Sequence, residues 1–443
     1  MDSTAYDDVG CDMIVINPEI SELGCRIYGK NSDLTIKDVQ EIAYFPAESH
    51  GTNETVQVTH IRVPQARSTH AIVSSKPAWS WGIEMGANEH GVAMGSVAIH
   101  CALRDTEDRT EKLVDIDLNR LALERGSTAS ECLKVAIKLI ETHGQGGIMT
   151  ETLPNEISYD SGYLIVDKHE AWLLETYDRH WAARLITEPW FNISNHYTIT
   201  TDYTRLSSDI HELCVEQGRC TKEDPFNWAA CLGKATANTL MRKRNGEKLI
   251  AQMLAASESG KLGLRHVADF LRDRDAGINR TPQPPKYSDT TSSQISLIPT
   301  EQRGVPPIHF ITATPDPAVS LFKPIVIHSD LRPKLQPVTS PIIRDDPANP
   351  TASPRFTHLP DRRHALYVLH EQMRVANSAH QLKCRAHFEN LELYAVEQYQ
   401  GALKMAKMDI PHQETPMLTS MFGRALDVEI KFLREYNADN KKK

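Results

Sequence analysis

The stretch GCDMIVI, residues 10–16, decides the fold together with the stretch RIYGKNSD, residues 26–33. Each begins or ends in a run of apolar residues, and the polar connection Pro18–Gly24 lies between them. Two such runs joined by a short polar segment predict a β-hairpin. The hairpin would bring the polar end of the second strand, Lys30 to Asp33, beside Cys11 at the start of the first strand.

Cys11 directly follows Gly10, a small residue suited to backbone scission, and the residues before it are few and mostly polar. If residues 1–10 were removed, Cys11 would carry both a thiol and a free α-amino group, a nucleophile and a base on one residue. The opposing interpretation is that Cys11 is a small buried residue, as free cysteines usually are.

Strands and helices alternate in blocks along the rest of the chain. The segment Thr55–Val63 alternates apolar and polar residues, which predicts a half-buried strand. The sequence from Thr128 to Glu131 matches a capping box, which predicts a helix start, and helical spacing then places Cys132 in the core. Strands are expected at residues 55–63, 70–75, 92–99, 162–167, 171–176, 181–186, 294–297, 309–312 and 321–327. Helices are expected at residues 113–125 and 128–143, a helical stretch at about 229–274, and a long helix at 361–408. This order predicts antiparallel sheets covered by helices, and not a βαβ repeat.

The composition limits the classes of partner. A formal net charge of −9 argues against binding to nucleic acid or to an anionic membrane, because either needs a basic face. No apolar run is long enough to cross a membrane, and residues 1–9 have no basic residue that would start a secretory signal. The eight cysteines contain no CxxC pair, which favours reduced thiols. We therefore expect a cytoplasmic protein.

Most catalytic motifs are missing from the sequence. It has no HExxH, no zinc-type Cys/His spacing, no P-loop and no GxSxG elbow. We therefore expect neither a metal nor a cofactor. Cys11 remains as the candidate nucleophile, and Asn88-Glu89-His90-Gly91 is interpreted as a hairpin turn, with His90 as a catalytic base the less favoured alternative.

Long segments of the sequence resemble the secernin family. They include GKNSD at 29–33, PAWSWG at 77–82, EMGANEHGV at 84–92, LERG at 123–126, HGQGG at 143–147, GYLIVD at 162–167, TPDP at 314–317 and PDRRH at 360–364. Together with Cys11 they extend over nearly the whole chain. Secernins are grouped with cysteine dipeptidases of the N-terminal-nucleophile hydrolase superfamily, so the resemblance implies an α+β fold, an αββα sandwich of two antiparallel sheets between helical layers.

The resemblance also implies a division of the chain. Residues 1–10 would be a propeptide that is removed autocatalytically, and residues 11–330 would form the hydrolase domain. Seven prolines between Pro333 and Pro360 indicate a linker or surface strap at 331–360. Residues 361–443 would be a helical C-terminal extension.

Four residues take catalytic roles by this resemblance. Cys11 is the nucleophile, Lys30 lies where related amidases have an arginine beside the nucleophile, and Asp33 lies where they have the aspartate that contacts the α-amino group. Asn195 matches an asparagine that helps to form the oxyanion hole. After the segment Gly91–Gly95 many secernins have Asn-Glu, whereas this chain has Ser96-Val97. If that asparagine normally donates to the oxyanion, Ser96 or a backbone N–H would have to replace it.

The resemblance implies a hydrolase of dipeptides or related amides with a small peptide or amide as substrate. Two alternatives stay open: a catalytically silent regulator of exocytosis that keeps the fold, and an amidase of the bile-salt or penicillin type. Lys30 and Asp33 could also form an ordinary surface ion pair. A homodimer is possible, and no nucleic-acid partner or membrane insertion is expected.

Overall fold

The computed structural model describes residues 10–35, 38–105, 107–150, 158–282, 288–301, 304–328, 331, 362–374, 378–408 and 415–440. Except for Gly10, the predicted propeptide lies outside these residues, and so does the predicted linker except for Leu331.

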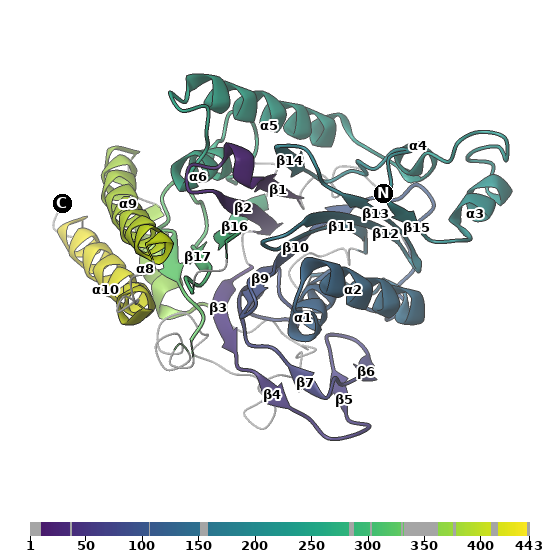
Figure 1. The fold of residues 1–443 in the computed structure, drawn as a ribbon, viewed down its shortest axis with the longest axis horizontal. Coiled ribbons are helices and arrows are strands. Elements are labelled where there is room, and N and C mark those ends of the chain that lie inside the picture. Colours follow the sequence, from purple (N-terminus) through teal and green to yellow (C-terminus); the bar gives the residue numbers. More distant parts are fainter. Residues whose placement is uncertain are drawn as a thin grey trace.

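Two large antiparallel sheets form the centre of the molecule (Figure 1). The six-stranded sheet has the order β14 (Trp190–Ile193), β1 (Gly10–Ile16), β2 (Cys25–Thr35), β16 (Ser288–Pro299), β17 (Ile308–Ile311) and β18 (Lys323–Ile325). The eight-stranded sheet has the order β15 (Arg205–Leu206), β13 (His180–Leu185), β12 (Ala171–Tyr177), β11 (Asp160–Val166), β10 (Ala93–Ile99), β9 (Met85–Asn88), β8 (Ile72–Pro77) and β3 (Gln40–Phe45). The predicted hairpin is confirmed, because β1 and β2 pair in antiparallel fashion around the short 3-10 helix η2 (Pro18–Ile20).

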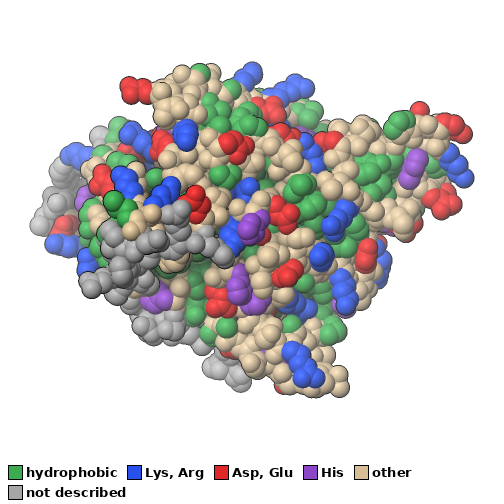
Figure 2. Space-filling view, viewed as in Figure 1, with side chains coloured by type: hydrophobic (Ala, Val, Ile, Leu, Met, Phe, Trp, Pro, Cys, Tyr) green, Lys and Arg blue, Asp and Glu red, His purple; other side chains and the backbone are tan. Residues whose placement is uncertain are grey.

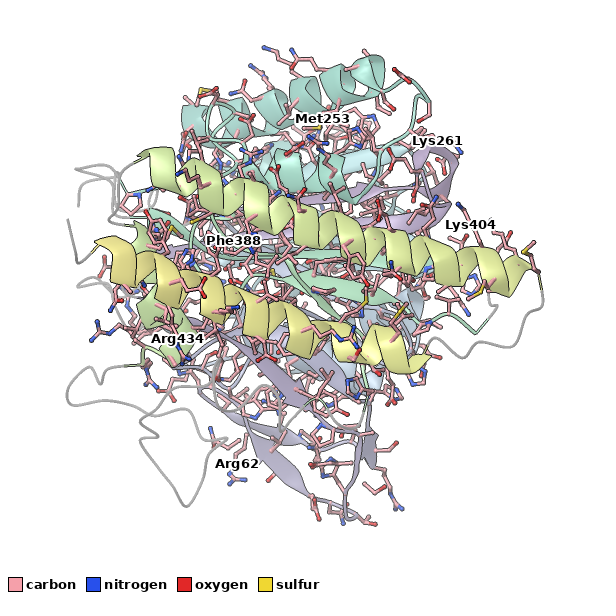
Figure 3. The ribbon with its side chains drawn as sticks, turned by 90° about the vertical axis from the view of Figure 1, so that its left-hand side faces the viewer. Arg62, Met253, Lys261, Phe388, Lys404 and Arg434 are labelled. Atoms are coloured by element: carbon pink, nitrogen blue, oxygen red, sulfur yellow. The ribbon has the colours of Figure 1, made fainter. Side chains whose placement is uncertain are left out.

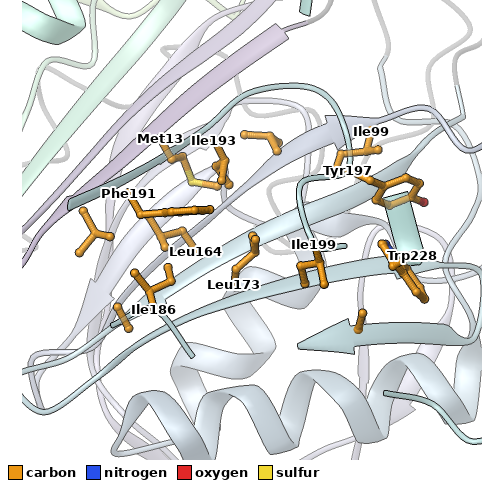
Figure 4. Close-up of a cluster of buried hydrophobic side chains, with 14 of the residues drawn as sticks. Met13, Ile99, Leu164, Leu173, Ile186, Phe191, Ile193, Tyr197, Ile199 and Trp228 are labelled. Atoms are coloured by element: carbon orange, nitrogen blue, oxygen red, sulfur yellow. The ribbon is translucent and has the colours of Figure 1, made fainter. Parts of the chain in front are cut away.

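The inner faces of the two sheets enclose one apolar core (Figure 4). Met13 and Phe191 come from the six-stranded sheet, and Leu164 and Leu173 from the eight-stranded sheet. Alternate residues of each strand point inward, which is why β1 supplies Cys11, Met13 and Val15 to this core.

Helices cover the outer face of each sheet. α1 (Asp115–Arg125) and α2 (Ala129–His143) pack on the eight-stranded sheet, with Cys132 fully buried as predicted. α5 (Ala237–Ala256) and α6 (Leu264–Arg272) pack on the six-stranded sheet. The layers therefore form an αββα sandwich, as the sequence predicts. Two shorter helices, α3 (Ile210–Glu216) and α4 (Trp228–Leu232), lie at one end.

The C-terminal helices belong to the same outer layer as α6. They are α8 (Ala365–Arg374), α9 (Ser378–Lys407) and α10 (Thr415–Asn440), and α9 and α10 lie side by side across the molecule in Figure 3. Tyr399 and Met421 share an apolar cluster with β1, β2 and β16. A fully buried ion pair joins Lys323 of β18 to Glu429 of α10, with Nζ 3.0 Å from Oε2. The predicted domain boundaries stay a prediction.

One predicted strand is wrong. Thr55–Val63 does not form a single strand but two short ones, β5 (Thr55–Gln57) and β6 (Arg62–Pro64), which pair with each other. The backbone N–H of Val58 donates to the carbonyl of Ile61, so a tight turn divides the segment. The strands β4 (Glu48–Ser49) and β7 (Ser68–Thr69) form another small pair nearby.

The surface carries charges of both signs. On the face in Figure 2, Lys and Arg side chains are interspersed with Asp and Glu. Among the described helices, none has both the length and the hydropathy to span a membrane.

Candidate active site

The pairing of β1 with β2 brings Cys11 beside the polar end of β2. Gly10 lies opposite Asp33, Cys11 opposite Ser32, and Met13 opposite Lys30. Side chains alternate along each strand, so Cys11 and Lys30 point toward the inner face while Asp33 points to the opposite face. The predicted cluster is therefore divided by the sheet into two halves.

The inner half holds the thiol of Cys11 and the amine of Lys30. Lys30 is fully buried, and its Nζ lies 3.5 Å from Oε2 of Glu84. Burial lowers the pKa of Lys30, but Cys11 and Glu84 raise it, and the net pKa is above its ordinary value. Lys30 therefore carries its positive charge directly beside the sulfur.

The thiol itself is protonated at neutral pH in this form of the chain. Cys11 is 4% exposed, and burial raises the pKa of its thiol to about 12, while Lys30 lowers that pKa. Glu84 and Asp33 raise it further. For this sulfur to act as a nucleophile, a base would have to take the proton before or during the attack.

The outer half surrounds the Gly10–Cys11 peptide bond with charged groups. A Cβ atom added to Gly10 would lie 2.6 Å from Nη1 of Arg280, 2.7 Å from Nη1 of Arg242 and 3.1 Å from Oδ2 of Asp33. The hydroxyl of Thr290 on β16 donates to Oδ1 of Asp33 over 2.6 Å. Burial raises the pKa of Asp33, and Arg242 and Arg280 oppose that rise. Only a glycine leaves room for both guanidinium groups as they lie here.

Asn195 holds the backbone nitrogen of Cys11. Its Oδ1 accepts from the N–H of Cys11 at 3.0 Å, and its Nδ2 donates to the carbonyl of Ala98 at 2.9 Å. The loop after β14 thus fixes the nitrogen that would become the α-amino group. One Nδ2 hydrogen is already used, so a role in an oxyanion hole would need the other.

Arg242 of α5 links these groups, and the sequence alone did not point to it. Its guanidinium donates to Oδ1 of Asn195 at 2.9 Å and to the carbonyl of Cys11 at 3.1 Å, and it forms ion pairs with Asp12 and Asp33. Arg242 is 2% exposed. In the sequence it lies in a basic run, Arg242-Lys243-Arg244, which is typical of a solvated helix face. Glu84 was also missed as a partner of Lys30, although it opens a segment that carries the family resemblance.

Ser96 does not face Cys11. Its hydroxyl donates to Oδ2 of Asp115 at 2.7 Å and accepts from Nδ2 of Asn119 at 3.0 Å, both on α1. The neighbour Gly95 points to the inner face, where an added Cβ would lie 2.6 Å from Cδ of Lys30. Ser96 therefore lies on the helix side of β10, so the expectation that its side chain could serve as an oxyanion donor is not supported by its position.

Metal-binding side chains do not gather around Cys11 within the described ranges. Elsewhere among the described residues, three side chains lie close enough together to hold an ion: His70, Glu89 and His90. They lie on the connections between β7 and β8 and between β9 and β10.

Comparisons with known proteins give limited likenesses. A scan against models of protein families finds no match. The chain is 14% identical to a variant of the conjugated bile acid hydrolase from Clostridium perfringens, with a TM-score of 0.38 and coverage of 68% of this chain and 88% of that one. For penicillin V acylase from Agrobacterium tumefaciens the identity is 14%, the TM-score 0.36 and the coverage 72% and 86%. For an N-acylethanolamine-hydrolyzing acid amidase ortholog from Caenorhabditis elegans the identity is 9%, the TM-score 0.32 and the coverage 66% of this chain and 94% of that one.

Proposed function

We propose that this chain is a cysteine hydrolase of amide bonds whose nucleophile, Cys11, becomes the N-terminal residue when residues 1–10 are removed. The observation that carries the proposal is the arrangement of charged groups around one peptide bond. Gly10 lies between Asp33, Arg242 and Arg280, while Lys30 lies beside the thiol on the other face. A buried thiol with no catalytic role does not require such an arrangement.

The first reaction would be cleavage of the chain by its own thiol. The sulfur of Cys11 attacks the carbonyl carbon of Gly10, the peptide bond breaks, and the nitrogen of Cys11 takes the thiol proton. Water then hydrolyses the thioester, which restores the thiol and releases residues 1–10 with a new carboxylate. The guanidinium groups of Arg242 and Arg280 can stabilise negative charge that develops on the carbonyl oxygen of Gly10.

Turnover of substrate would use the same atoms. The freed α-amino group, with a reference pKa of roughly 7.7–8.0, can accept the thiol proton near neutral pH. Lys30 favours the thiolate, and Oδ1 of Asn195 holds the amino group where it now holds the N–H of Cys11. The thiolate attacks an amide carbonyl, an acyl-enzyme forms as the amine leaves, and water releases the acid. The second hydrogen on Nδ2 of Asn195 and nearby backbone N–H groups are the candidate oxyanion donors.

The finer assignment is a dipeptidase of the secernin type that acts in the cytoplasm. It rests on the sequence resemblance, and the buried, charged surroundings of Cys11 suit a small polar substrate. A bile-salt or penicillin type of amidase uses the same nucleophile on a different acyl group, so a substrate panel separates the two.

A silent regulator of exocytosis is the second candidate, and one observation favours it. Cys11 is 4% exposed and burial raises the pKa of its thiol to about 12, so the thiol is neither accessible nor ionised while Gly10 and Cys11 are joined. A chain that is never cleaved would keep this thiol buried and protonated.

Intact mass spectrometry of the purified, folded protein tests the proposal. The wild type should lose residues 1–10, and Cys11→Ala should keep them. Cys25→Ala removes another buried cysteine, at the start of β2, and should be cleaved like the wild type. A folded wild type that still begins at Met1 would refute autoprocessing. Cleaved protein that turns over neither dipeptides nor N-acyl amides would favour the regulator.

A further inference from the structure

Two histidines and a glutamate converge on the surface away from Cys11. Nε2 of His90 lies 3.0 Å from Nδ1 of His70, and Oε1 of Glu89 lies 3.9 Å from the same Nδ1. The three ligand atoms all lie within 4.8 Å of one another. The imidazole rings are nearly perpendicular, at 83°, with centroids 4.3 Å apart.

The backbone around these side chains is held in place by hydrogen bonds. Nδ2 of Asn88 donates to the carbonyls of Leu123 and Gly126 at 3.0 and 2.7 Å, and its Oδ1 accepts from the N–H of His90 at 3.1 Å. The N–H of His70 donates to the carbonyl of Glu124 at 2.8 Å. Both connections are thus attached to the end of α1, so the backbone from which the three side chains extend is fixed.

The donor set matches a known coordination chemistry. Zn²⁺ takes imidazole nitrogen and carboxylate oxygen at about 2.0–2.2 Å, and tetrahedral geometry then places ligand atoms about 3.3–3.6 Å apart. The separations of 3.0 and 3.9 Å bracket that spacing. Three protein ligands leave the fourth position for water or another small ligand.

A further contact orients one ligand. Oγ of Ser127 lies 3.2 Å from Nε2 of His70. When Nδ1 of an imidazole binds a metal, its Nε2 carries the hydrogen, and an oxygen acceptor there fixes the tautomer and the ring orientation. The N–H of Ala71 donates to Oε1 of Glu89 at 2.9 Å, which orients the carboxylate in the same way.

The cluster borders a cavity. His90 lines a surface cavity of about 380 Å³ together with Lys168, Ile298 and Pro307. An ion on His90 would therefore have space beside it for an exchangeable ligand, and Lys168 would attract an anionic one.

We propose that His70, Glu89 and His90 form a binding site for a divalent transition-metal ion, Zn²⁺ by its ligand preference. The site lies at the surface and is separate from the cysteine chemistry. A bound ion would connect the β7–β8 and β9–β10 connections, and its fourth ligand would be water or an anionic group in the cavity.

Zinc binding to the metal-free full-length protein tests the site, and competition with a chromophoric chelator measures it. All proteins carry Cys11→Ala, so that the candidate nucleophile contributes no binding. The parent should bind one Zn²⁺ that His90→Gln and Glu89→Gln lose or bind at least about tenfold more weakly, and Ser127→Ala should weaken binding by about 10- to 100-fold. His180→Gln is the matched control, because it removes a histidine that pairs with a single carboxylate, Asp209, at 3.1 Å. Zinc should raise the Tm of the parent and of the control but not that of His90→Gln.

Cobalt substitution gives a second readout. Co²⁺ bound here should show tetrahedral absorption without a thiolate charge-transfer band. Equal zinc stoichiometry and affinity in the parent, His90→Gln and Glu89→Gln would overturn the proposal, and the cluster would then be a hydrogen-bonded imidazole pair next to a carboxylate. Unchanged circular dichroism of the metal-free variants shows whether a loss of binding reflects the ligand or the fold.

Discussion

The backbone nitrogen of Cys11 donates a hydrogen bond of 3.0 Å to the side-chain oxygen of Asn195, a residue 184 positions later in the chain. The same oxygen accepts from Arg242. One amide group therefore connects the candidate nucleophile, through its nitrogen, to the cation that pairs with Asp12 and Asp33. The position of that nitrogen depends on three separate parts of the chain.

Asn195→Ala should slow both the cleavage before Cys11 and any later turnover by on the order of 100-fold or more, because a positioned polar partner is lost. The measurement is the rate of propeptide loss by intact mass. Asn192→Ala is the matched control, since Asn192 is buried on the adjacent strand but bonds to Lys243 instead. Equal cleavage rates in the two variants would contradict a role for Asn195 beyond stability.

Arg242→Met should lower the free energy of unfolding by about 3–5 kcal/mol, because Asp12 and Asp33 would keep buried charges without their guanidinium partner. Adding Asp12→Asn should recover part of this loss, and denaturant unfolding measures both. Arg244→Met, on the exposed side of the same helix, should change stability little. If Arg242→Met were as stable as Arg244→Met, the ion pairs of Arg242 would make no contribution to the free energy of unfolding.

Lys30→Met should make Cys11 a poorer nucleophile near neutral pH, because Lys30 lowers the pKa of that thiol. The pH profile of labelling by a thiol alkylating agent should shift upward, whereas Lys30→Arg should keep a profile close to the wild type. Lys30→Met should also lower stability, because it leaves the buried carboxylate of Glu84 without its partner. Adding Glu84→Gln removes that charge and should restore part of the stability. If labelling of Lys30→Met followed the wild-type profile, Lys30 would have no part in activating the sulfur.

Gly10→Ala should slow cleavage by on the order of 10- to 100-fold, because the new methyl group displaces Arg242 and Arg280 from the scissile bond. The atoms that it meets are the ends of flexible side chains, so we expect the fold to persist. Gly401→Ala on α9 faces open space and serves as the control for a glycine substitution. Cleavage of Gly10→Ala at the wild-type rate would remove the two arginines from the processing reaction.

His196, the residue after Asn195, should make the protein sensitive to acid. Burial, and then Lys243 and Arg242, lower its pKa from 6.5 to about 4. The unfolded chain binds the proton first, so stability is present above pH 6.5 and is lost as the pH falls toward 4, by about 1.4 kcal/mol per pH unit. His196→Gln should reduce that slope in urea unfolding measured across this range. An unchanged slope would assign the acid sensitivity to other groups.

The parts of the fold that local pattern specifies were predictable. The β1–β2 hairpin, the helix that begins after Thr128 and the turn at Asn88–Gly91 each depend on neighbouring residues. The single strand predicted at Thr55–Val63 was wrong, because the alternation of apolar and polar residues does not reveal a tight turn between two short strands.

The site was predictable only where its members share one hairpin. Arg242 and Glu84 are brought to β1 and β2 by tertiary packing, and burial changes a basic helical run into one deeply buried guanidinium. The proposed zinc ligands His70 and His90 are 20 residues apart, a spacing that matches no metal motif. Side chains that meet through the fold alone leave no local signal.

Strand β2 presents Lys30 to one face of the sheet and Asp33 to the other, because the two residues are an odd number of positions apart. Length changes in this region should therefore be tolerated very unequally. One residue inserted between Lys30 and Asp33 would turn one of them onto the wrong face, whereas an insertion in the connection Pro18–Gly24 would leave both in register. Homologous chains that keep the chemistry should differ in length at that connection and not within β2.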